Sequence, residues 1–261
     1  QLIDTKLTNA VAAINDYTAW LANELKPQVE SGERSRDFRL GDTLYEQKFK
    51  YNIGSSFSAK EIYQKAIERK LELHQKMYEV SERLWPKYFG ETTFPEYREE
   101  AIMKMIDTLS YVHTHRDSFI TTIRSQIPEL VEFINEKDLL TLDPEKPLTV
   151  RATPEYMRGV AGASISAPGP YDANAETYYN VTPLDHYSEE EAESYLREYN
   201  QYLLQILNIH EAIPGHYTQL VYSNKSPSLI KSILGNGAMI EGWAVYTELM
   251  MLENGYGNNS D

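Results

Sequence analysis

Residues 210–216 combine two histidines with a glutamate, a set of side chains that can bind a metal ion and use it. Imidazole is a good ligand for Zn²⁺, and a carboxylate beside the first ligand can take a proton from a metal-bound water. The stretch reads His-Glu-Ala-Ile-Pro-Gly-His. We therefore interpret His210 and His216 as candidate zinc ligands and Glu211 as a candidate general base.

The spacing of the two histidines differs from that of the common H-E-x-x-H helix, whose ligands are four residues apart on one face. His210 and His216 are six residues apart, and an unbroken α-helix would separate them by roughly 120°. Pro214 disrupts helical hydrogen bonding, and Gly215 tolerates backbone angles that other residues avoid. The sequence therefore predicts a break at this Pro-Gly step that brings both imidazoles to one ion.

A catalytic zinc ion needs a third protein ligand, with the fourth position left for water. Glu241 is the natural candidate because it interrupts an otherwise apolar helical stretch, and a buried carboxylate must be paired or bind a metal. Glu248 lies seven residues further on, nearly two helical turns, and so on the same face. We assign Glu241 to the metal and Glu248 to a supporting position from which it orients a ligand histidine.

Together these motifs resemble the DUF885 family of bacterial proteins, which is related to gluzincin-type metallopeptidases. The resemblance rests on residues 210–216 followed by Gln219, and on Glu-Gly-Trp-Ala-Val-Tyr-x-Glu at residues 241–248. It also takes in residues 37–41 (Asp-Phe-Arg-Leu-Gly) and 178–180 (Tyr-Tyr-Asn). The resemblance therefore extends over the whole chain.

By this resemblance zinc is the cofactor, His210, His216 and Glu241 are its ligands, and Glu211 is the general base. One position departs from the family pattern. Many relatives carry a second histidine directly after the Gly-His pair, and this chain has Tyr217 there. Family members are also considerably longer at both ends and are often exported or lipid-anchored. The resemblance thus implies a fragment of a longer protein with an extracytoplasmic, periplasmic or lipid-anchored location.

The composition argues against several classes of function. Lys and Arg number 25 against 39 Asp and Glu, and the net charge of −14 disfavours nucleic acids and anionic membranes as partners. The chain has no cysteine, which excludes disulfides and thiolate metal sites and leaves the redox compartment open. No apolar run approaches the ~18 residues of a membrane span. A peptide or small amide is the expected partner, and the sequence does not indicate the oligomeric state.

Residues 1–138 have the pattern of a helical scaffold. Apolar periodicity and proline positions predict helices at residues 3–25, ended by Pro27, at 58–85, at 95–110, and at 116–127 with a continuation to 134. Ser58 and Glu61 match a capping box at the start of the second helix. His113 and His115 are alternate residues that do not share a helical face, so a turn is expected there.

Residues 139–261 form the predicted catalytic region, which begins with a small β element at about residues 148–182. The alternative is that the two regions form one continuous domain. Prolines exclude a long helix there, and strands are expected at 148–152 and 176–181, with a strand or loop at 161–167. In metallopeptidases an edge strand near the zinc commonly pairs with the extended substrate, which is one role for this region. The alternative is that it only covers the core.

Two helical stretches carry the candidate ligands. A capping box at Ser188 and Glu191 starts a predicted helix through His210, in which the histidine shares one face with Leu196, Tyr199, Leu203 and Ile206. A later helix, bent near residues 235–237, carries Glu241 and ends at 254. We expect these two helices to form the catalytic face.

The sequence as a whole predicts a mainly α-helical fold with a small β element and a zinc-dependent hydrolase, most simply a peptidase. Tyr179, Asn180, Tyr217 and Gln219 are candidate supporting or substrate-binding residues, and the two tyrosines are candidates for stabilising an oxyanion. One alternative keeps the zinc and changes the bond to an ester or a non-peptide amide. The other is a non-catalytic helical binding or scaffold module, in which the same residues form a buried polar network.

Overall fold

The computed structural model of the chain describes residues 2–34, 38–143, 145–146, 148–159, 161–169, 171–172 and 175–257. Asp37 of the family-like stretch 37–41 lies outside these residues. Contacts between Cα atoms divide the chain into a first unit, Gln1–Tyr51, and a second unit, Asn52–Asp261. The division predicted between residues 138 and 139 lies inside the second unit, because the helices before it pack against the elements after it.

The first unit is helical and exposed. It contains α1 (Leu2–Trp20), a π-helical turn η1 (Leu21–Leu25), α2 (Lys26–Glu30) and most of α3 (Gly41–Ile53). The helix predicted to end at Pro27 continues to Glu30, because the π-helical turn η1, in which Lys26 N donates to Leu21 O, comes just before the proline and changes the hydrogen-bond register there.

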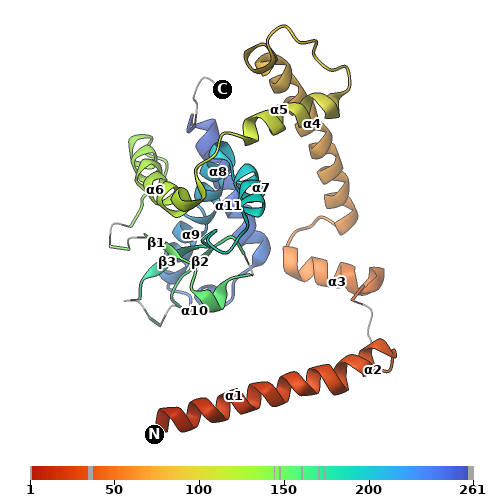
Figure 1. The fold of residues 1–261 in the computed structure, drawn as a ribbon, viewed down its shortest axis with the longest axis vertical. Helices are drawn as coiled ribbons and strands as arrows, with labels where there is room; N and C mark the ends of the chain where they lie inside the picture. Colours follow the sequence, from red (N-terminus) through yellow and green to blue (C-terminus); the bar gives the residue numbers. More distant parts are fainter. Residues whose placement is uncertain are drawn as a thin grey trace. The chain divides into compact units, whose positions relative to one another are not determined.

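The second unit holds the remaining elements (Figure 1). In chain order they are α4 (Ala59–Phe89), α5 (Arg98–Ser110), η2 (Arg116–Ser118), α6 (Phe119–Glu136), β1 (Leu148–Ala152), η3 (Glu155–Met157), β2 (Ala163–Ser166), β3 (Thr177–Val181), α7 (Glu189–Glu198), α8 (Gln201–Glu211), α9 (His216–Asn224), α10 (Leu229–Ile233) and α11 (Gly237–Glu253). Both predicted capping boxes are present, at the starts of α4 and α7. The prediction of a mainly α fold with a small β element is confirmed.

Two helix boundaries differ from the prediction. Helix α4 runs through Pro86 to Phe89, since a proline so near the end removes only one hydrogen bond. The single helix expected from Ser188 to His210 is two helices, because the Asn200 side chain accepts hydrogen bonds from Tyr202 N and Leu203 N and so begins α8 anew.

This break changes which face of α8 is buried. The buried residues of α8 are Leu204, Asn208 and Ile209, whereas Leu203, expected in the apolar stripe, is 46% exposed. His210 lies at the edge of the buried face and is half-buried. The His210 side chain can therefore be positioned by protein contacts and still be reached by solvent.

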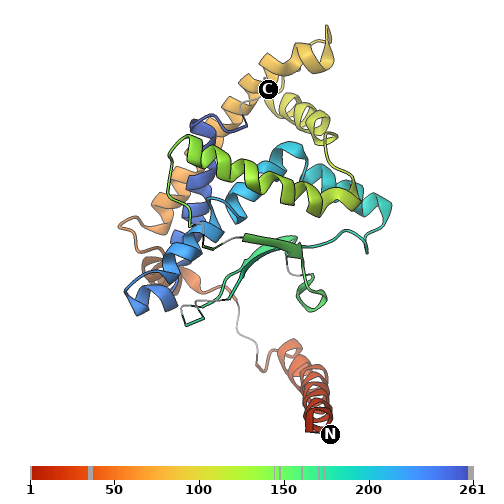
Figure 2. The same cartoon turned by 90° about the vertical axis from the view of Figure 1, so that its left-hand side faces the viewer.

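The sheet has the strand order β1-β3-β2, with β1 parallel and β2 antiparallel to the central strand β3. Helix α6 packs against β1 and α8, and α8 packs against β2. Figure 2 shows these two helices on one face of the sheet. The β element thus forms a layer beneath the helix that ends in His210 and Glu211.

The core lies between this sheet and its helices. Its fully buried large side chains are Phe119, Ile123, Leu130, Ile134, Tyr179, Val181, Leu204, Ile209 and Met251. A buried polar chain crosses it, in which Tyr179 Oη donates to Asn208 Oδ1 at 2.9 Å and Asn208 Nδ2 donates to Gln126 Oε1 at 2.5 Å. Strand β3, α8 and α6 are therefore joined by hydrogen bonds as well as by apolar contact.

Among the helices of the described ranges, none combines the length and the apolar character that crossing a bilayer requires.

Substitution of Tyr179 by Phe tests the buried polar chain. Loss of the hydroxyl leaves Asn208 Oδ1 buried without its donor, and we expect the free energy of unfolding to fall by about 1–3 kcal/mol. Chemical denaturation measures the change. The matched control is Tyr156→Phe, because that side chain is 85% exposed. Equal unfolding midpoints for the two variants would contradict the assigned role of the hydroxyl.

Candidate metal centre

The turn between α8 and α9 sets the geometry of the candidate site. Helix α8 ends at Glu211 and α9 begins at His216, so the helix breaks between the two histidines as the sequence predicts. The Ile213–Pro214 peptide bond in this turn is cis. Gly215 N donates a hydrogen bond to Ile209 O at 2.9 Å, which holds the turn against the end of α8.

Gly215 has no room for a side chain. A Cβ atom at this position would lie 1.8 Å from His210 O and 2.4 Å from Ile209 O, and both of these atoms belong to the backbone. No rotamer change relieves such a contact. The close approach of the two backbone segments therefore requires glycine.

The two imidazoles converge at this turn. The ring centroids of His210 and His216 are 4.7 Å apart, with the ring planes at 87°. Glu241 from α11 reaches both rings, with its Oε2 3.5 Å from His210 Nε2 and 3.7 Å from His216 Nε2. Ligand atoms of His210, Glu211 and His216 all lie within 4.8 Å of one another. Glu241 is not part of this group, and its side chain is 67% exposed, so the burial expected for it from the sequence is wrong although its carboxylate approaches both imidazoles.

Helix α11 holds this arrangement at two further points. Glu248 Oε1 lies 2.6 Å from His210 Nδ1, so the contact expected between this glutamate and a candidate ligand histidine is present. A carboxylate at Nδ1 favours the tautomer whose Nε2 lone pair faces Glu241. Trp243 Nε1 donates to Pro214 O at 3.0 Å, which ties the turn to the same helix.

Burial changes the acidity of two side chains in the cluster. Burial raises the pKa of Glu211, the nearby His210 opposes this, and Glu241 raises the pKa further. Burial lowers the pKa of His216, His210 adds to the effect, and Glu241 opposes it. A low pKa favours the neutral imidazole, which is the form that binds metal ions.

The donor set fits a zinc ion. Two imidazoles with one or two carboxylates are typical of catalytic zinc sites. His216 Nδ1 is buried and has no hydrogen-bond partner within the described part of the chain. This nitrogen is distinct from Nε2, which faces Glu241 and is the atom placed to coordinate an ion.

The other predicted residues lie around this cluster in different ways. Tyr179 is fully buried, with its hydroxyl bonded to Asn208, and burial raises its pKa. Asn180 is also fully buried, and accepts a hydrogen bond from Arg151 Nε at 2.8 Å. These contacts give both side chains a part in packing, and their roles toward a substrate stay predictions.

Tyr217 and Gln219 belong to α9, the helix that begins with His216. Tyr217 is buried, and burial with the charge of Asp143 raises its pKa to about 12. Gln219 is half-buried, and its Oε1 has no partner among the described residues. Both lie within one turn of His216 along the chain, so they can contribute hydrogen bonds near it.

Sequence reasoning missed two supporting residues, Asn208 and Trp243. Asn208 occupies a buried position two residues before His210, where a polar side chain among apolar ones is a usable signal. Trp243 lies between the two glutamates of α11, but its indole N–H meets a carbonyl of a distant turn. The sequence carries no sign of that contact.

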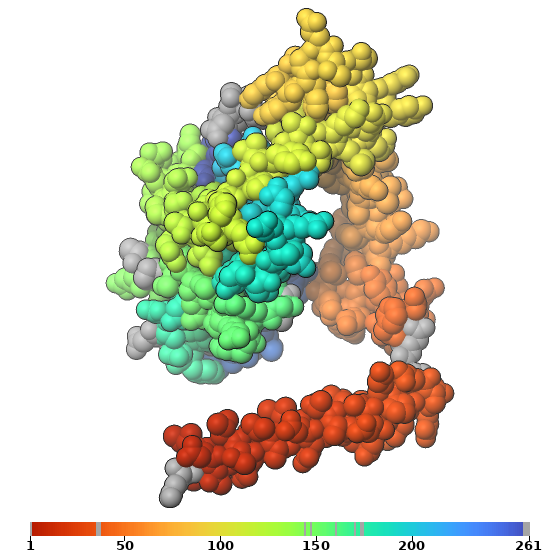
Figure 3. Space-filling view, viewed as in Figure 1, coloured from red at the N-terminus to blue at the C-terminus, as the bar shows by residue number. Residues whose placement is uncertain are grey.

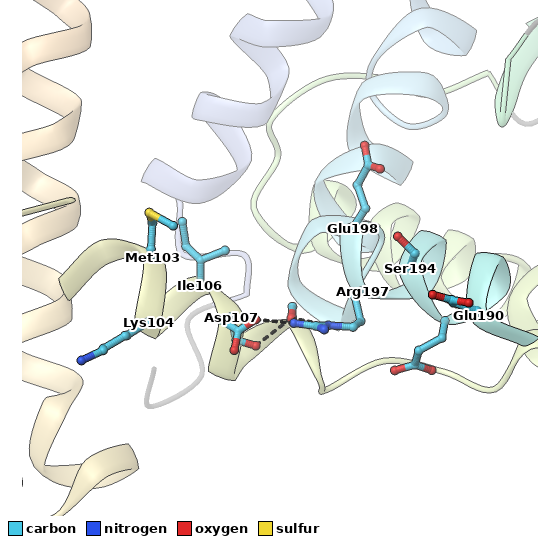
Figure 4. Close-up of a pocket in the computed structure, with 10 residues that line it drawn as sticks. Met103, Lys104, Ile106, Asp107, Glu190, Ser194, Arg197 and Glu198 are labelled. Carbon is cyan, nitrogen blue, oxygen red and sulfur yellow. Dashed lines mark hydrogen bonds and ion pairs between the residues drawn. The ribbon is translucent and has the colours of Figure 1, made fainter. Parts of the chain in front are cut away.

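A cavity of about 790 Å³ lies between α5 and α7 and shares no lining residue with the cluster. Figure 3 shows α7 at the surface beside the segment from α5 to η2. In this cavity Arg197 pairs with Asp107 and donates to Ser110 Oγ at 3.0 Å (Figure 4). These contacts join two helices and leave no candidate chemistry there.

A family model described as a bacterial protein of unknown function, DUF885, matches residues 1–261. The chain belongs to the DUF885 family. No curated protein matches the chain.

Two solved structures are similar to this DUF885 chain. One, a "putative lipoprotein" of unknown function from Shewanella oneidensis, is 57% identical over 100% of this chain, with a TM-score of 0.81. The other, given the same "putative lipoprotein" description and from Colwellia psychrerythraea, is 21% identical over 82% of this chain, with a TM-score of 0.63, and supports the fold alone. The chain spans 46% of the first structure's chain and 35% of the second's.

Substitution of Gly215 by Ala tests the turn. The added methyl group collides with the His210 and Ile209 carbonyls, so we expect the two imidazoles to separate and any zinc affinity to fall by about tenfold or more. Calorimetric zinc titration measures the affinity. Gly237→Ala is the matched control, since nothing lies within 4 Å of its added Cβ. An unchanged affinity in a folded Gly215→Ala variant would contradict the inferred crowding.

Proposed function

We propose that this chain carries the metal-binding part of a zinc-dependent hydrolase, most simply a peptidase, with His210, His216 and Glu241 as the ligands. The observation that carries the proposal is the meeting of two imidazoles and the Glu241 carboxylate at 3.5 and 3.7 Å. These side chains come from three helices, and Glu241 lies 25 residues beyond His216 in the sequence. The hydrogen bond that Glu248 Oε1 accepts from His210 Nδ1 supports it, because ligand histidines are usually oriented by a carboxylate on their other nitrogen.

Zinc, when bound, would lower the pKa of a coordinated water toward ~7 and polarise the substrate carbonyl. Glu211 is next to the ligand His210, and its half-buried carboxylate has a raised pKa. A raised pKa makes the carboxylate a better proton acceptor at neutral pH. We therefore assign Glu211 the role of taking a proton from the attacking water and delivering it to the leaving amine.

The sheet supplies a place for an extended substrate. Strand β2 is at the edge of the order β1-β3-β2, and it contacts α8, the helix that carries His210 and Glu211. An edge strand can pair with the backbone of an incoming peptide. This supports a peptide over a small ester as the substrate, and Ala163–Ser166 as the strand that aligns it.

Tyr217 is the better of the two oxyanion candidates. Tyr179 Oη already donates to Asn208, whereas Tyr217 directly follows His216 at the start of α9. The part of the longer relatives that this chain does not span can also supply the group. Metal binding is therefore proposed for the residues of this chain, and hydrolysis for a protein of the relatives' full length.

The location is proposed from the relatives. Both similar structures carry the lipoprotein description given above. We infer an extracytoplasmic, lipid-anchored protein for this chain as well.

Metal analysis of the purified chain tests the zinc site directly. We expect about one zinc per chain after exposure to zinc and dialysis, and a loss of about tenfold or more in affinity in His210→Ala, His216→Ala and Glu241→Ala. His115→Ala is the control, since that side chain is 72% exposed and outside the cluster. Absence of zinc in the unaltered chain would favour the scaffold alternative, in which Glu248 alone satisfies His210.

Substitution of Glu211 by Gln tests the general base in the longer protein. We expect zinc content to be kept, because the ligands remain, while kcat for peptide hydrolysis falls by about 10²-fold or more. Glu253→Gln at the end of α11 is the control for loss of one carboxylate. A panel of peptide, ester and non-peptide amide substrates identifies the bond. Undiminished turnover by Glu211→Gln would refute the assignment.

A further inference from the structure

A cavity of about 820 Å³ is lined by α9, α10 and α11, the first and last of which also carry His216 and Glu241, although neither of these two residues lines the cavity. Gln219, Leu220 and Ser223 line it, and they follow His216 on α9 by three, four and seven residues. Residues at these spacings stand on one helical face. The cavity therefore continues along the face of α9 that begins with His216, and its volume lies in the range of sites that bind small molecules.

The walls of this cavity are mostly apolar. The apolar side chains that line it include Leu220, Ile233, Leu234, Met239, Ile240 and Trp243. Met239 and Leu234 are 55% and 69% exposed, so apolar surface here meets water. Of the described residues around the cavity, Lys231 alone carries a charge. Transfer of an apolar group from water into this cavity is favourable, whereas a cationic group would be repelled by the Lys231 ammonium.

Polar atoms with unmet hydrogen bonds stand on the same helix. Thr218 Oγ1 and Gln219 Oε1 are buried and lack a partner in the described part of the chain, and both residues line the cavity. Buried acceptors are nearly always satisfied, and an unsatisfied one asks for an explanation. Gln219 Oε1 is covered in this conformation, and rotation of the side chain into the cavity would let it accept a hydrogen bond from a ligand amide N–H, which provides one.

We propose that this cavity is the subsite for a large apolar or aromatic side chain of the substrate, with Gln219 accepting a hydrogen bond from the substrate backbone. This inference rests on the proposed hydrolase function. The cavity would add a substrate preference that the metal ligands do not determine. Residues such as phenylalanine or leucine are preferred beside the cleaved bond, and lysine and arginine are rejected.

Binding of capped amino acids to the metal-free chain tests the subsite separately from the zinc chemistry. The probes are N-acetyl-L-phenylalaninamide, N-acetylglycinamide and N-acetyl-L-lysinamide. The chain contains three tryptophans, so the indole N–H signal of Trp243 can be assigned by NMR with a Trp243→Phe variant and followed during titration. We expect the phenylalanine probe to shift this signal and to bind about tenfold more tightly than the other two.

Met239→Asp should weaken binding of the phenylalanine probe by about fivefold or more, because it places a carboxylate in an apolar wall. Leu252→Asp is the matched control on the same helix, 48% exposed and outside the cavity, and Met239→Leu is the conservative one. Both controls should bind as the unaltered chain does.

Equal binding of the three probes, or a Trp243 signal that does not move, overturns the subsite. These measurements use chelator-treated protein, so they remain interpretable if no zinc binds. Failure of the zinc titration with retained, Met239-dependent binding would instead refute the hydrolase function and leave an apolar binding site.

Discussion

The contact of Gly215 with the backbone of His210 and Ile209 is the constraint on which the candidate site depends. Without the turn that this contact permits, six residues of continuous helix would point the two imidazoles in different directions. With it, the second histidine starts a new helix and its ring comes to lie 4.7 Å from the first. The absence of a side chain at Gly215 thus determines where the two histidine side chains lie.

The surrounding structure holds that turn from two sides. On one side, α8 is fixed to the sheet and to α6 through Tyr179, Asn208 and Gln126, which are buried and hydrogen-bonded to one another. On the other, α11 contacts His210 through Glu248 and the turn through Trp243. A buried polar group that loses its hydrogen bond has no water to replace it, so displacing these side chains costs free energy. These contacts therefore fix the position of α8 as well as stabilising the fold. The donors of the cluster are consequently preorganised by helices that do not themselves carry the histidines.

Much of this could be predicted from local sequence rules, and the failures have physical causes. Capping boxes at Ser58 and Ser188, the Pro-Gly break and the seven-residue spacing of the glutamates on α11 each depend on neighbours in sequence. The second helix start at Asn200 was missed because an asparagine within an apolar periodicity is as compatible with an exposed helix position as with a cap. Because of that error, the predicted buried face of α8 included Leu203, which is exposed in the structure. Trp243 was missed because its partner is brought to it only by tertiary packing.

Trp243 contacts both the turn of the candidate metal centre and the cavity beside α9. Its indole N–H holds the Pro214 carbonyl, and its side chain lines the cavity between α9, α10 and α11. Anything that presses on the ring from within the cavity therefore acts on the segment that carries the histidines. If the proposed zinc ion and the proposed substrate side chain both bind, their binding is linked thermodynamically, and by reciprocity each changes the affinity of the chain for the other by the same factor.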